Sequence, residues 1–228
     1  MNFLSLLLLI TIPAIYFYPF GVLSLLFSLL LAFFLKKIFD SGRFPYLLLF
    51  FLLLIVSFVI SGHHLYNDMA IINVANSQRG EHLNFQTNLF AKLLHNKSLI
   101  SMYYLQNLSD RLSLSTIFAS GMYPNISKFL PLGFLFPWYL VGFLVSVKSD
   151  YRKYLSPIFI IAISALFLLT AILTQSSAQI FMFAIIWFVG FESVLQIGKL
   201  PKPWAFLCLV LNLTYLGIFF LSYKSFLV

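Results

Sequence analysis

The polar side chains that could perform chemistry gather in one part of the chain, residues 61–128. This stretch holds all four histidines and three of the six acidic residues: His63, His64, His82, His95, Asp68, Glu81 and Asp110. A zinc site on a helix usually has histidines four residues apart, or a Cys/His cluster with fixed spacing. Here two histidines are adjacent, the other two are far apart, and Cys208 is the single cysteine. The pattern predicts no metal site, no cofactor and no intrachain disulfide, and favours solvated or interfacial histidines.

A second candidate is Glu192, the only acidic or basic residue that falls inside the apolar runs of this sequence. An ionisable group within a membrane span is by default a candidate functional group. Glu192 could be an interfacial carboxylate paired with Lys199, seven residues further along the same helix face. It could also belong to a proton or ion relay, which would need a partner in another apolar run. Only Ser, Thr, Gln and Asn212 are found there, so the interfacial pair is favoured. Glu192 and Asn212 are both predicted to be membrane-embedded polar groups.

The composition indicates the medium in which these residues lie. Apolar residues make up 61% of the 228 and charged residues only 9%, whereas a soluble domain carries roughly 25% charged residues. Lipid must therefore face most of the surface. The net charge of +8 comes mainly from short segments between apolar runs. No phosphate-binding motif or basic helix accompanies it, which argues against nucleic acid as a partner.

The apolar runs predict an all-α, polytopic transmembrane protein with about seven spans, since a spanning helix needs about 20 apolar residues. The expected spans are residues 2–17, 20–35, 45–60, 129–147, 155–173, 179–197 and 204–222. The first run has no preceding basic residues and no small-residue cleavage site, so we expect it to be retained and not to act as a signal peptide. The first two runs share the turn Tyr18–Gly21 and could instead form one re-entrant hairpin.

The connections between the runs predict the orientation. Basic residues occur in alternate connections: Lys36, Lys37 and Arg43; Lys148, Arg152 and Lys153; Lys199 and Lys202. The intervening short connections, 18–21 and 174–178, carry no charge. Cytoplasmic loops are enriched in Lys and Arg, so this pattern predicts a multi-pass protein of the plasma (cytoplasmic) membrane with a cytoplasmic N-terminus. Residues 61–128 and the C-terminal tail would lie outside.

The chain is thus expected to have three parts: three N-terminal spans in 1–60, an external helical segment in 61–128, and four C-terminal spans in 129–228. In the external segment, apolar residues recur every four positions and predict amphipathic helices over about 84–95 and 98–113. Such helices could lie flat on the outer leaflet or form the wall of a substrate groove.

Three stretches carry a resemblance to a known family. They are Asn76–Asn96, "NSQRGEHLNFQTNLFAKLLHN", followed by "LSLSTIFASGMYP" and "PLGFLFPWYLVGFLVSV". Over about residues 57–173 the chain resembles bacterial membrane glycosyltransferases of the family 39 type, in the region where an external helical segment precedes the C-terminal membrane helices. That family has a GT-C fold and transfers a sugar from a polyprenyl-phosphate donor to an acceptor outside the membrane.

The resemblance implies a lipid-linked sugar as a partner but supplies no catalytic residue. Family members carry a catalytic acid in the first external loop, whereas Tyr18–Gly21 contains none, and they are much longer than this chain. If a sugar-lipid site persists, its residues would be Arg79, Glu81 and His82. Arg79 would bind phosphate through two hydrogen bonds, and Glu81 or His82 would orient hydroxyl groups. The alternative is a capped turn with a surface ion pair.

Three functions follow from these observations. The first is a non-catalytic or accessory relative of the glycosyltransferases, acting on lipid-linked sugars at the cell envelope. The second is a structural subunit of a membrane complex, bound to partner subunits and to lipid and without chemistry of its own. The third is a small-solute transporter, for which an internal repeat would be expected; the runs before residue 61 do not mirror those after residue 128.

Overall fold

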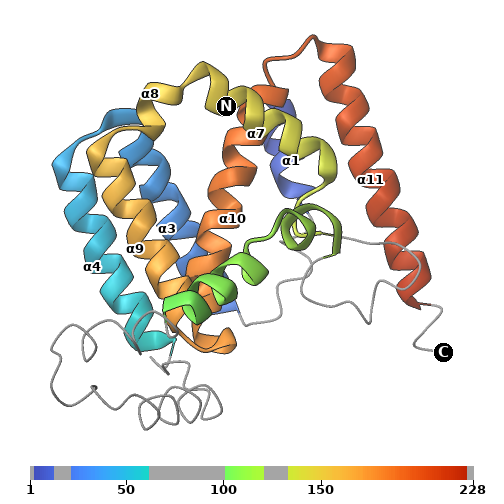
Figure 1. Ribbon diagram of the computed structural model, residues 1–228. Coiled ribbons are helices and arrows are strands. Elements are labelled where there is room, and N and C mark those ends of the chain that lie inside the picture. The colour runs from blue at the N-terminus through green and yellow to red at the C-terminus, as the bar shows by residue number, and fades with distance from the viewer. Residues whose placement is uncertain (1–2, 13–21, 62–100, 121–132, 225–228) are drawn as a thin grey trace, which may run out of the picture.

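The computed structural model describes residues 3–12, 22–61, 101–120 and 133–224. These residues are mainly helical and contain no β-sheet. This confirms the predicted all-α class (Figure 1). The helices are α1 (Phe3–Ile10), α3 (Val22–Ser41), α4 (Phe44–Ile60), α7 (Pro137–Ser149), α8 (Tyr151–Tyr154), α9 (Pro157–Ile172), α10 (Gln175–Ile197) and α11 (Lys202–Lys224). Residues 101–111 are also helical, and Thr116–Ser120 form a π-helical turn.

Helix α10 lies at the centre of the described bundle (Figure 1). It packs against α3, α7 and α9, and residues 177–190 are buried without exception. A helix that is apolar on every side is stable only when other elements or lipid surround it. Helix α4 lies outside α3 and α9, and α11 packs against α1.

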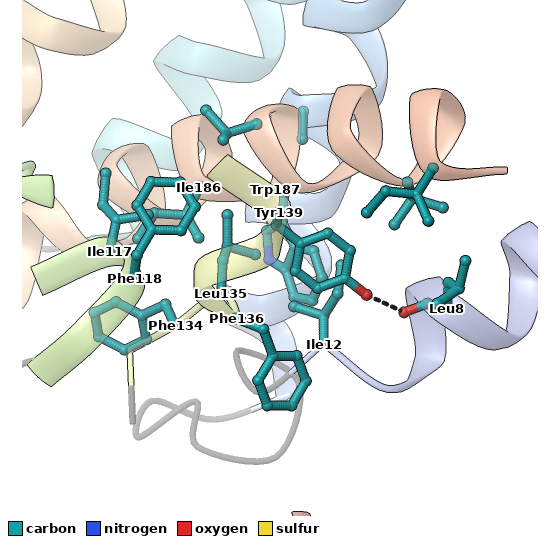
Figure 2. Packing of buried hydrophobic residues seen from close by; sticks show 14 of the residues in the cluster. Leu8, Ile12, Ile117, Phe118, Phe134, Leu135, Phe136, Tyr139, Ile186 and Trp187 are labelled. Atoms are coloured by element: carbon teal, nitrogen blue, oxygen red, sulfur yellow. Dashed lines mark hydrogen bonds between the residues drawn. The ribbon is translucent and has the colours of Figure 1, made fainter. Parts of the chain in front are cut away.

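Two apolar clusters meet along α10. One joins α1, α7 and α10 through Leu8, Leu135, Tyr139 and Trp187, as Figure 2 shows. The other joins α3, α4, α9 and α10, and includes Phe39, Phe50, Phe159 and Phe188. Because α10 contributes buried side chains to both clusters, it holds the two halves of the bundle together.

Two segments within the described ranges are long and apolar enough to cross a membrane, Val22–Ser41 and Ser177–Ile197. Helices α4 and α9 are apolar but shorter, with 17 and 16 residues. This supports a membrane location by length and composition only, and it does not confirm the predicted count of seven spans.

Several helix boundaries differ from prediction, most of all at the ends of α1 and α3 and at the start of α7. Helix α1 ends at Ile10, whereas the predicted first span continues to residue 17; residues 13–17 lie outside the described ranges. Helix α3 continues to Ser41 instead of ending at residue 35, so Lys36 and Lys37 lie in its last turns and not in a loop. It ends at Gly42, whose φ of 60° is a left-handed conformation that glycine adopts at low cost. The helix expected over 129–147 begins at Pro137, after buried, non-helical residues 133–136; residues 129–132 lie outside the described ranges. Proline favours the first turn of a helix, where its missing N–H is not needed.

The basic connections lie together at one end of the bundle, where α3, α7 and α10 end and α4, α8 and α11 begin (Figure 1). We call this the basic end and define it by Lys36, Lys37, Arg43, Lys148, Arg152, Lys153, Lys199 and Lys202. At the opposite end, Ser177 Oγ donates to the carbonyl of Ser61 at 2.9 Å and joins the start of α10 to the end of α4. This grouping of the basic residues at one end is the one expected from their occurrence in alternate connections between the apolar runs. The side of a membrane on which each end lies stays a prediction.

Residues 101–120, the described part of the segment 61–128, pack into this opposite end of the bundle. Arg111 is buried, and its Nη1 donates to the backbone carbonyls of Thr170 and Leu173, the latter at 3.0 Å. The carbonyl of Ile117 accepts from the backbone N–H of Leu135 at 2.8 Å. Of the two predicted amphipathic helices, the one over 98–113 is helical at 101–111. The other, over 84–95, lies outside the described residues.

Candidate functional site: a buried carboxylate at the basic end

Glu192 is the buried acidic side chain of the described bundle, with 2% of its side chain exposed. One carboxylate oxygen, Oε1, forms an ion pair with Lys36 Nζ, and the other, Oε2, accepts a hydrogen bond from Ser146 Oγ at 2.7 Å. A carboxylate removed from water is costly unless charged and hydrogen-bonding groups compensate it. Glu192 therefore joins α10 to α3 and α7 at one point.

Lys36 forms ion pairs with two acidic side chains. Its Nζ lies 2.8 Å from Asp40 Oδ1, one turn further along α3, while it pairs with Glu192 across the helix interface. It also lies 4.9 Å from the ring centroid of Phe39. The extension of α3 beyond residue 35 makes this possible, because it carries Lys36 on a helix that packs against α10.

The predicted pairing of Glu192 with Lys199 is wrong. Lys199 Nζ instead donates to Gln196 Oε1 at 3.2 Å. The prediction assumed that the helix continues through Lys199, but α10 ends at Ile197 and Lys199 lies in the exposed turn that follows. A residue beyond the helix end no longer lies above the residue seven positions before it.

Aromatic side chains pack next to this site. Tyr154 Oη lies 3.1 Å from Ser146 Oγ, the same hydroxyl that binds Glu192. The ring of Tyr154 meets Phe39 and Phe159 edge to face, at centroid distances of 4.6 and 5.7 Å. Burial raises the pKa of the Tyr154 hydroxyl, so this group stays neutral and acts as a hydrogen-bonding partner.

A more exposed pair lies in the turn between α7 and α8. Lys153 Nζ is 2.9 Å from Asp150 Oδ1. The hydrogen bond from Lys153 lowers the pKa of Asp150, and Lys199 lowers it further through its charge. The same bond raises the pKa of Lys153, with smaller contributions from Asp40 and Glu192. Asp40, Asp150 and Glu192 thus interact electrostatically with Lys36, Lys153 and Lys199.

A separate polar network surrounds Asn212. Its Nδ2 donates to Thr11 Oγ1 at 2.7 Å and to Tyr139 Oη at 2.8 Å, and its Oδ1 accepts from Trp138 Nε1 at 2.9 Å. The hydroxyls of Tyr139 and Thr11 each donate to the carbonyl of Leu8 at 2.9 Å; Figure 2 shows the bond from Tyr139. Asn212 is buried, and it ties α11 to α1 and α7; its location within a membrane stays a prediction.

The other predicted site residues lie outside the described ranges. These are Arg79, Glu81 and His82, together with His63, His64 and His95. Within the described ranges, no group of three His, Cys, Asp or Glu side chains is placed to hold a metal ion. Sequence reasoning missed Lys36, Ser146 and Arg111. Only Lys36 gave a signal, its spacing of four residues from Asp40, which is typical of a helical ion pair.

Comparisons with protein-family models, with curated proteins and with solved structures found no match for this chain. Its own residues must therefore support any functional proposal. At the basic end, Oε2 of Glu192 accepts a hydrogen bond from Ser146, and Oε1 lies in an ion pair with Lys36. In this arrangement the carboxylate joins three helices.

Proposed function

We propose that the chain is a multi-pass membrane protein whose bundle is a scaffold for the segment 61–128. The observation that carries this proposal is the apolar outer surface of the helices around α10. Soluble monomers rarely expose apolar patches larger than a few hundred Å². The exposed side chains on α4 and α11 include Leu48, Leu52, Ile55, Val59, Trp204, Phe206, Val210 and Leu213. Lipid would cover these faces.

In the proposed orientation the basic end is cytoplasmic and the segment 61–128 is external, in the plasma (cytoplasmic) membrane. Single cysteines at Ser77 and Ser149, each in a Cys208→Ser background, test this. A membrane-impermeant thiol reagent added to intact cells should label the cysteine at 77 and reach the one at 149 only after permeabilisation. The reverse pattern would invert the orientation, and labelling of both sites in intact cells would argue against a sealed multi-pass arrangement.

Within that location we propose a non-catalytic, accessory role with lipid-linked sugars at the cell envelope. The resemblance over residues 57–173 and the absence of an acid in Tyr18–Gly21 support this role. The anchoring of residues 101–120 through Arg111 and Ile117 supports the view that the external segment belongs to the folded protein.

Replacing Arg79, Glu81 and His82 together by Ala tests the proposed role. The purified wild type should retain a polyprenyl-phosphate sugar in native mass spectrometry, and the triple variant should lose it. Asp68→Asn, a charge change in the same segment, is the matched control and should retain it. If the wild type carries no such lipid when it is supplied, or if the triple variant binds as well as the control, the proposed role is wrong.

A structural subunit of a membrane complex is the second candidate. It is favoured by the internal engagement of Glu192 and Asn212, together with the wide apolar faces of α4 and α11. Purification under native conditions should then recover a stoichiometric partner subunit. A chain that is monomeric and stable by itself in detergent would count against this candidate.

A small-solute transporter receives less support. Lys36 does supply the charged partner that a relay through Glu192 would need. The pair nevertheless ties α3 to α10, and Ser146 adds α7, so a relay would have to break contacts that hold three helices together.

A further inference from the structure

The basic end carries more positive charge than its acids compensate. In the described residues it has eight basic side chains and three acidic ones, Asp40, Asp150 and Glu192. Lys36 pairs with Asp40 and Glu192, and Lys153 pairs with Asp150. Six basic side chains are therefore left without an acidic partner among the described residues: Lys37, Arg43, Lys148, Arg152, Lys199 and Lys202. All six are exposed.

Four of the six border the junction of α7 and α8 with the turn between α10 and α11. Gln196 Nε2 lies 3.5 Å from Ser149 Oγ and joins the ends of α10 and α7. The charge of Lys199 lowers the pKa of Asp150, which places this lysine within electrostatic reach of the α7–α8 turn. We define the basic face as Lys148, Arg152, Lys199 and Lys202.

Amphipathic and apolar side chains adjoin this basic face. Tyr151 and Leu155 are 51% and 66% exposed beside Arg152, and Leu200 and Trp204 are 46% and 61% exposed on either side of Lys202. Tyr and Trp are enriched where a bilayer meets water, because their rings combine an apolar body with a polar atom. Exposed basic, aromatic and apolar side chains therefore occur within a few residues of one another at this face.

We propose that the basic face binds the headgroups of anionic phospholipids in preference to zwitterionic ones. The inference rests on the proposed membrane location. Basic clusters at the cytoplasmic ends of membrane helices attract anionic lipid. Membrane insertion alone requires only that the charges stay on one side, whereas this proposal requires that the folded protein retains anionic lipid at a defined place. The retained lipid would interact with α7, α8 and the start of α11 together.

Two double variants that lose the same charge distinguish a general need for positive charge at this end from lipid binding at the basic face. Arg152→Gln/Lys199→Gln removes two charges from the basic face, and Lys37→Gln/Arg43→Gln removes two from the α3–α4 connection at the same end. Each full-length protein is purified into nanodiscs that contain phosphatidylcholine with or without phosphatidylglycerol. Native mass spectrometry then counts the phosphatidylglycerol that stays with the released protein.

The wild type should retain phosphatidylglycerol over phosphatidylcholine, and the preference should weaken at high salt because the charges are exposed. In Arg152→Gln/Lys199→Gln the preference for phosphatidylglycerol should fall roughly tenfold or more. In Lys37→Gln/Arg43→Gln most of this preference should remain. No preference in the wild type, or an equal loss in both variants, would overturn the proposal. Alkaline extraction of cell membranes provides the separate control. If the wild type is extracted, the membrane location is wrong as well. If it resists extraction but shows no preference for phosphatidylglycerol, only the lipid site is wrong.

Discussion

Because Glu192 is buried, we expect substitution of its partners to lower the free energy of unfolding more than other single substitutions at the basic end. Removal of one member of a buried ion pair leaves an uncompensated charge. Lys36→Met should lower the free energy of unfolding by roughly 2 kcal/mol or more, while Lys37→Met, at an exposed neighbouring position, should change it little. Chemical unfolding in detergent measures both. Addition of Glu192→Gln to Lys36→Met should restore part of the loss, and similar stabilities for the two lysine variants would contradict the pairing.

Asn212 allows a second test of a buried polar group. Asn212→Leu keeps the approximate volume but leaves the indole N–H of Trp138 without its acceptor. An unpaired buried polar group costs about 1–3 kcal/mol, so the variant should unfold at a lower temperature than the wild type. Thr214→Leu, at an exposed position on the same helix, is the control. Equal unfolding temperatures for both variants would show that the network contributes nothing to stability.

At the scale of residues, the sequence drew attention to two of the buried polar groups, Glu192 and Asn212, but not to their partners. Glu192 and Asn212 stand out because each interrupts an apolar run. Their partners come from helices distant in the sequence: Lys36 for Glu192, and Thr11 and Trp138 for Asn212. Periodicity within one segment carries no information about which other helix lies against it, so these contacts could not be predicted from the sequence alone.

At the scale of elements, hydropathy located the helices but misplaced some of their ends. The predicted end of α3 lies at residue 35, directly before Lys36 and Lys37. Charged residues, however, do not stop a helix. Backbone hydrogen bonding continues until Gly42, whose N–H donates to the carbonyl of Ile38 at 2.8 Å. Helix ends are set by glycine and proline geometry, and Pro137 sets the start of α7 in the same way.

The end of α3 can be tested at Gly42. Its φ of 60° is unfavourable for a residue with Cβ, so Gly42→Ala should cost about 1 kcal/mol of stability. Gly217→Ala, inside α11 where a Cβ would also meet no neighbouring atom, should instead stabilise by about 0.5–1 kcal/mol, because alanine favours helix. Opposite signs in thermal unfolding would support this end of the helix. Equal shifts would argue that Gly42 does not adopt the left-handed conformation.

The α7–α8 turn has a predicted response to acid. The pKa of Asp150 is lowered in the folded protein, mainly by the hydrogen bond from Lys153. The pair therefore stabilises the fold above the unfolded pKa of about 4, and this contribution is lost as the pH falls through the lower, folded pKa. Because the pair is largely exposed, the loss should be at most about 0.5 kcal/mol. Unfolding temperatures measured between neutral and acid pH should fall less for Asp150→Asn than for wild type, and parallel curves would contradict the pair.

At the scale of the whole molecule, the central position of α10 could not be foreseen. The runs that became α3, α4, α9 and α10 are all strongly apolar, and a helix that faces lipid resembles one that faces other helices. Close approach distinguishes α10: a Cβ at Gly142 of α7 would lie 2.8 Å from the carbonyl oxygen of Ser193. Such contacts become evident only when the helices are packed together.

The attachment of the segment 101–120 to the bundle provides a test of the whole arrangement. Arg111 donates to the carbonyls of Thr170 and Leu173 at the end of α9, where the helix has no further N–H groups to satisfy them. Arg111→Met keeps most of the apolar stem of this side chain but removes these hydrogen bonds. The variant should release the segment from the bundle while the packing around α10 persists.

Limited proteolysis with a non-specific protease measures that release. Arg111→Met should be cleaved within residues 101–120 several times faster than wild type, and the fragment that contains α7 to α11 should stay protected. Asp110→Asn, at the exposed neighbouring position, should be cleaved at the wild-type rate. If Arg111→Met is cleaved no faster, the segment is held by other contacts, such as the burial of Ile117 and Phe118 in the apolar cluster with α7. Cleavage throughout the bundle would instead mean that Arg111 stabilises the whole fold and not the attachment of one segment.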